Sequence, residues 1–117
     1  MADPRSYLPL KPVDLELLLA LADDDRHGYG LVQAIAAHTN GLVVLDPGNL
    51  YRVVKRLLAE GLVGEAGQRS APDEGGARRR YYRLTPFGRR LARAEALRLE
   101  HVVRTARRQK LLPSKPK

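Results

Sequence analysis

Residues 46–63, DPGNLYRVVKRLLAEGLV, restrict the fold more than any other segment of the chain. An Asp-Pro-Gly turn opens the segment and Gly61 closes it, so we predict a helix over 48–60. Its apolar residues recur every three or four positions, which places one stripe toward a core. The stripe consists of Leu50, Val53, Val54, Leu57 and Leu58. The other side is polar and basic, which is typical either of a helix that meets a polar partner or of an ordinary solvated amphipathic helix.

The segments around this helix predict a short, ordered series of elements. Breaks at 23–27 and at Asn40-Gly41 separate two apolar helices, and Thr85-Pro86 has the form of a helix start. The expected elements are helices over 13–22 and 28–39, a short strand over 42–45, the helix over 48–60, strands over 62–67 and 78–85, and a helix over 86–110. This order predicts a mostly α (α+β) fold, a winged helix-turn-helix with a long C-terminal helix, whose third helix enters the DNA major groove.

The last helix carries a heptad-like seam. Ala92, Ala96, Leu99, Val103 and Ala106 repeat with steps of four, three, four and three, which predicts a helix-to-helix contact. The dimer interface is expected to include these residues together with Leu15, Leu18, Leu19, Leu91 and Val102. The chain is therefore divided into an N-terminal arm (1–12), a DNA-binding domain (13–85), a dimerisation helix (86–110) and a flexible tail (111–117).

Charge is distributed unevenly along the chain. Residues 1–77 hold 7 Lys/Arg against 11 Asp/Glu, whereas residues 78–117 hold 14 against 2. Such an asymmetry points to a polyanionic partner, although a solubilising basic tail is the alternative.

The exposed side of the helix over 48–60 fits direct contact with DNA. Arg52 can donate two hydrogen bonds to guanine, and Asn49 can pair with adenine. The backbone N–H groups of Gly48 and Asn49 are expected to face a phosphate. Three further side chains are expected to hold phosphates: Tyr51, Lys55 and Arg56.

The hairpin over 66–82 is expected to be the wing. Arg78, Arg79 and Arg80 lie at the base of its loop, and adjacent positive charges in a strand are unfavourable unless counter-charge arrives. DNA phosphates would supply that charge, and the alternative source is the loop acids Asp73 and Glu74.

Three motifs resemble those of the PadR family of transcriptional regulators: HGYG at 27–30, DPGNLYRVVKRLLAEGLV at 46–63, and the Arg-Tyr-Tyr-x-Leu-Thr-x-x-Gly pattern that ends at Gly88. The resemblance covers roughly residues 13–91. Asn49 stands where the family commonly has Thr, and many relatives have a larger C-terminal helical domain.

The resemblance implies a homodimeric winged-helix repressor whose C-terminal helix forms the dimer. It implies groove-helix roles for Tyr51, Lys55 and Arg56, and wing-strand positions for Tyr81 and Tyr82. Tyr81 is accordingly included among the expected DNA contacts. A two-fold dimer would bind an inverted repeat in double-stranded DNA with half-sites about 10 bp apart. A small-molecule effector that changes the angle between the two wings is a further hypothesis.

Other classes of function find little support in the sequence. Without cysteine, thiolate catalysis and cysteine-ligated zinc are excluded. His27, His38 and His101 are too scattered for a metal site, and no catalytic constellation stands out, so we expect no enzyme activity, metal or cofactor. No apolar run reaches the length of a membrane span and the start lacks the order of a signal peptide, so we expect a cytoplasmic protein. A winged-helix module for protein interaction or non-specific DNA binding is the competing hypothesis.

Overall fold

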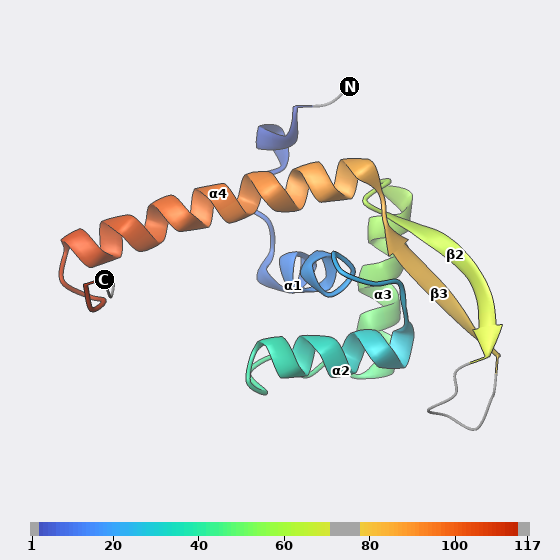
Figure 1. The fold of residues 1–117 in the computed structure, drawn as a ribbon. Coiled ribbons are helices and arrows are strands. Elements are labelled where there is room, and N and C mark those ends of the chain that lie inside the picture. Colours follow the sequence, from blue (N-terminus) through green and yellow to red (C-terminus); the bar gives the residue numbers. More distant parts are fainter. Residues whose placement is uncertain (1–2, 71–77, 115–117) are drawn as a thin grey trace.

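The computed structural model describes residues 3–70 and 78–114, which form a winged helix-turn-helix with a long last helix (Figure 1). The helices are η1 (Pro4–Tyr7, 3-10), α1 (Pro12–Ala20), α2 (Gly28–His38), α3 (Pro47–Ala59) and α4 (Pro86–Arg108). The strands are β1 (Arg26–His27), β2 (Val63–Ser70) and β3 (Arg78–Leu84). They form one antiparallel sheet in the order β1-β3-β2. The predicted mostly helical α+β class is therefore confirmed.

Side-chain caps begin three of the four α-helices, α2, α3 and α4. The Asp46 carboxylate accepts a hydrogen bond from the Asn49 N–H at 2.8 Å, and the Thr85 hydroxyl accepts one from the Gly88 N–H at 2.9 Å. Both caps precede a proline in the first turn, as the sequence predicts. His27 caps α2 in the same way, through Nδ1.

The strand predicted over 42–45 is wrong. This run is a loop in which Val43 and Leu45 pack on the core while Leu42 and Val44 are exposed. The third strand of the sheet is instead β1, where Arg26 pairs with Tyr82 and His27 with Tyr81. A two-residue strand with polar side chains has no periodicity of its own, because pairing with a distant strand alone holds it extended.

The core lies where α1 meets α2, α3 and α4. In Figure 1, α1 lies between α4 above and α2 below, and the β2–β3 hairpin lies at the end of the molecule where α4 begins. Leu18 and Leu91 are fully buried here, and Ala92 is 7% exposed. These three residues therefore belong to the core of the single chain, which corrects their expected place in the dimer interface.

From residue 3 onward, the N-terminal arm contains η1 and packs against α4. Tyr7 of η1 meets Phe87 edge-on, with ring centroids 5.5 Å apart. The first turns of α4 are thus covered, whereas its C-terminal half extends away from the other helices (Figure 1). Across residues 3–70 and 78–114, no helix is both long enough and apolar enough to cross a membrane.

Candidate nucleic-acid interface

Helix α3 buries one face and exposes the other, as its periodicity predicts. Leu50, Val54 and Leu57 are buried, whereas the Tyr51 side chain is 58% exposed. Three more polar residues of this helix are exposed: Asn49, Arg52 and Lys55. The exposed face carries hydrogen-bonding and positively charged groups on a rigid element, which is the arrangement that base-edge contact requires.

Asp46 binds the first turn of α3 with both carboxylate oxygens. Its Oδ1 accepts the backbone N–H of Asn49, and its Oδ2 accepts the Asn49 side-chain amide at 2.8 Å. The Asn49 N–H is therefore not directed at a ligand, which corrects the expected phosphate contact of that backbone group. The same bond orients the Asn49 side chain.

The Arg56 side chain is paired with an acidic residue of the same chain. Its Nη1 and Nη2 atoms donate to the two carboxylate oxygens of Asp14 in α1, at 3.0 and 2.7 Å. Glu60 lies 3.7 Å from the same guanidinium. The hydrogen bond that Arg56 donates to the Asp14 carboxylate is the main cause that raises the pKa of Arg56. This geometry argues against the phosphate contact expected for Arg56.

In the wing, the two tyrosines of β3 lie on opposite faces of the strand. Tyr82 is buried under the hairpin, whereas Tyr81 lies on the opposite face, edge-on to His27 and 4.4 Å from the Arg69 guanidinium. Arg69 also pairs with Asp25 at 3.0 Å.

The wing arginines receive part of their counter-charge from the sheet itself. Arg80 lies 3.7 Å from Glu65 of β2, and Arg78 donates to the Gln68 carbonyl at 3.0 Å. Arg78, Arg79 and Arg80 are all exposed. The loop acids considered as an internal source, Asp73 and Glu74, lie outside the described residues.

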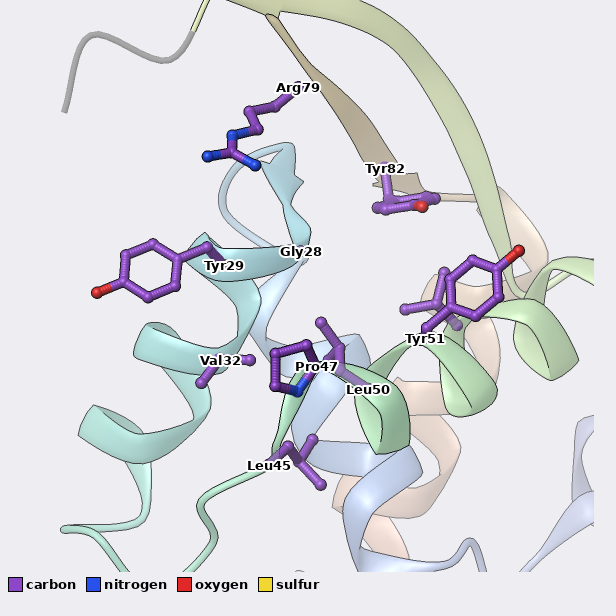
Figure 2. A pocket seen from close by; sticks show the side chains of 10 residues that line it. Gly28, Tyr29, Val32, Leu45, Pro47, Leu50, Tyr51, Arg79 and Tyr82 are labelled. Carbon is purple, nitrogen blue, oxygen red and sulfur yellow. The ribbon is translucent and has the colours of Figure 1, made fainter. Parts of the chain in front are cut away.

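A pocket of about 470 Å³ lies between α2, α3 and β3. Figure 2 shows Tyr51 and Tyr82 on one side and Tyr29 and Arg79 on the other, above Pro47. Tyr29 is 55% exposed, and sequence reasoning missed it because its spacing from the apolar residues of α2 resembles a core stripe. The pocket joins the wing to the start of α3 in one concave surface.

A second hollow, of about 540 Å³, borders α3 on the side of α1. Lys11 lines it from the N-terminal side of α1, and Asn49 and Arg52 line it from α3. Helix α3 is thus flanked on both sides by concave surface with cationic side chains, which suits a ligand that is itself extended and anionic.

Apolar residues are also exposed on α4 and on α1. Leu19, Val102 and Val103 are 39%, 48% and 37% exposed, and Ala96 is exposed too. Leu15, Leu99 and Ala106 are half-buried. Leu97, which is 61% exposed, lies off the heptad-like seam and was not predicted.

Among residues 3–70 and 78–114, no cluster of three or more His, Asp or Glu side chains could hold a metal ion.

Comparison with known proteins gives one consistent result. The model of the transcriptional regulator PadR-like family matches residues 17–94. The transcriptional regulator Rv3488 of Mycobacterium tuberculosis is 37% identical over 92 residues, which cover 79% of each sequence.

Two solved structures share the fold. A transcriptional regulator from Clostridium thermocellum is 26% identical with a TM-score of 0.65, and the match covers 89% of this chain and 90% of that one. Bacillus subtilis PadR, solved in complex with operator DNA, is 15% identical with a TM-score of 0.59, over 93% of this chain and 51% of that one.

Proposed function

This chain belongs to the PadR-like family of transcriptional regulators, and from that premise we propose that it is a homodimeric repressor that reads an inverted repeat in double-stranded DNA. The family is one of regulators rather than enzymes, in agreement with the sequence. Helix α3 would enter the major groove, and the β2–β3 hairpin would be the wing. The Bacillus subtilis PadR structure, which shares the fold, was solved with operator DNA.

One observation carries the proposal: the contrast among the three cations of α3. Within the described part of the chain, Arg52 and Lys55 make no hydrogen bond or ion pair, whereas Arg56 is bound by Asp14. Exposed, unpaired cations on a rigid helix are suited to an external anion.

The contact proposed for each residue follows from its position in α3 or in the wing. Arg52 and Asn49 lie toward the start of α3, where side chains reach base edges, so we assign base contacts to them. Lys55 and Tyr51 would bind phosphates, as would the Gly48 N–H. In the wing, Arg78, Arg79, Arg80 and Tyr81 would contact the backbone. Tyr29 joins this set because it lines the same pocket as Tyr51 and Arg79.

A second copy of the chain would cover the exposed apolar residues of α4 and α1. The projecting half of α4 would leave Val102 and Val103 in water in a monomer, whereas a two-fold contact would bury them. Half-sites about one helical turn apart follow from such symmetry.

The proposal is tested by selecting bound sequences from random duplex DNA. Enrichment of a palindrome would support a dimeric, operator-reading regulator. If no sequence were enriched and binding were lost at moderate salt, the basic face would be a non-specific anchor and the repressor proposal would fail.

A further inference from the structure

We propose that Asp14 withholds Arg56 from the DNA backbone and so limits the sequence-independent part of DNA affinity. This inference rests on the proposed function, because it concerns the same helix α3. Asp14 of α1 lies outside the three PadR-like motifs and outside the residues that the family model matches, 17–94. The inference gives this residue an effect on DNA binding.

The geometry of the pair is that of a closed bidentate contact. Both terminal nitrogens of Arg56 donate to Asp14, one to each carboxylate oxygen, at 3.0 and 2.7 Å. The Asp14 side chain is 8% exposed and the Arg56 side chain 37%. A buried carboxylate needs its counter-charge, since leaving it unpaired in the interior is strongly unfavourable. The buried partner therefore determines where the half-exposed one lies.

Arg56 otherwise has the position of a DNA contact. It follows Arg52 by four residues and so lies one helical turn further along the same side of α3. Both residues line the hollow between α3 and the start of α1. Arg52 is exposed in that hollow, whereas Arg56 is turned against α1. If Asp14 lost its charge, the guanidinium would be released beside the cations that already face outward.

The release of Arg56 can be measured as a change in the salt dependence of DNA affinity. Log affinity falls with log salt concentration, and each cation that neutralises a phosphate makes this slope steeper by about 0.9. A slope that is steeper by 0.9 corresponds to an additional change in affinity of about 3.5-fold between 50 and 200 mM salt. The contribution of Arg56 is thus separable from that of base contacts, which do not depend on counterion release.

The experiment is a double-mutant cycle on a mixed-sequence DNA duplex. It compares the slopes of the full-length wild type, Asp14→Asn, Arg56→Gln and the double variant. We expect Arg56→Gln to leave the slope unchanged, Asp14→Asn to steepen it by about 0.9, and the double variant to return to the wild-type value. A slope reduced by about 0.9 in Arg56→Gln would overturn the inference, because Arg56 would then already contact phosphate. An unchanged slope in Asp14→Asn would overturn it as well.

Two controls complete the design. Lys55→Gln should lower the slope by about 0.9, which shows that the assay detects the loss of a phosphate-binding cation on α3. Circular dichroism melts confirm that each variant is folded; if Asp14→Asn were unfolded, the Arg56→Gln slope alone would decide, by the criterion above. Wild-type protein that failed to bind DNA at all would overturn the proposed function, whereas normal wild-type binding with a reduced Arg56→Gln slope would overturn this inference only.

Discussion

The Glu95 carboxylate accepts a hydrogen bond from the backbone N–H of Leu10 at 2.8 Å, although the two residues are 85 positions apart in sequence. Arg98 pairs with the same carboxylate, with contacts at 2.5 and 3.1 Å. Glu95 is only 2% exposed. The arm that precedes α1 is therefore fastened to α4 by a buried, charged acceptor, and it forms part of the fold.

This contact predicts a pH-dependent stability. The hydrogen bond from Arg98, followed by that from Leu10, holds the pKa of Glu95 below its ordinary value of 4.5. A lowered pKa in the folded state stabilises the protein fully above the unfolded value, and this stabilisation is lost as pH falls through the folded one. Glu95→Gln should lower the free energy of unfolding by about 2 kcal/mol at neutral pH.

The check is a set of thermal melts of wild type and Glu95→Gln from roughly pH 6 to pH 3. The difference between the two proteins should shrink on the acid side. A difference that stayed constant throughout would show that the Glu95 charge contributes nothing to stability.

A second prediction concerns a glycine in the first turn of α4. Gly88 is buried, and a Cβ there would overlap the Leu62 carbonyl oxygen and lie 2.9 Å from the Leu84 side chain. Ala normally stabilises a helix relative to Gly by up to about 1 kcal/mol. At Gly88 the overlap should reverse the sign, so that Gly88→Ala costs about 1–3 kcal/mol.

Gly30→Ala in α2 is the matched control for this prediction, because the nearest atom to its added Cβ lies at an ordinary contact distance of 3.5 Å. Chemical denaturation of both variants measures the two changes. Equal effects at the two positions would contradict the close approach at Gly88.

Much of the architecture could be predicted because it follows from local chemistry. The Asp46-Pro47 and Thr85-Pro86 pairs mark helix starts, and positive φ angles at Gly41 (80°) and Gly61 (78°) are found where the chain stops two helices. Periodicity predicted the buried stripe of α3. Signals of this kind lie within a few residues of the feature that they predict.

What could not be predicted depends on residues far apart in the chain. The β1 strand exists only because β3 pairs with it, and the run over 42–45 has strand-like composition without a partner. The bond between Arg56 and Asp14 spans 42 positions. This bond changes the interpretation of Arg56, because its spacing along the helix alone suggested a contact with DNA. Similarly, Leu18 belongs to an apolar helix face, but only packing decides whether that face meets the core or a partner.

The third prediction separates base contacts from phosphate contacts. Arg52→Ala should relax selectivity at one base position, at a cost of about 1–3 kcal/mol. Lys55→Ala should weaken binding to all sequences alike and lower the salt slope by about 1. Binding titrations on the selected duplex and on single-base variants of it measure both effects. If Lys55→Ala altered the preferred base instead, the two roles would have to be exchanged.

The fourth prediction concerns the apolar surface of α4. Val103 is 37% exposed on the projecting helix, where a second copy would bury it. Val103→Glu would place a charge in that contact, and an unpaired buried charge is strongly unfavourable, so the dimer should dissociate. Because each monomer would then hold only one half-site, affinity for a palindromic duplex should fall by about 100-fold or more, the range that linked binding supplies.

The matched control is Leu42→Glu, which introduces the same charge at an apolar residue that is 87% exposed in the loop before α3. Sedimentation at several protein concentrations should show a monomer for Val103→Glu and an unchanged dimer for Leu42→Glu. Thermal melts should show that both variants keep their fold, because neither side chain is buried in the single chain. A Val103→Glu variant that still sedimented as a dimer would place the subunit contact on another surface, and the half-site spacing inferred from it would no longer stand.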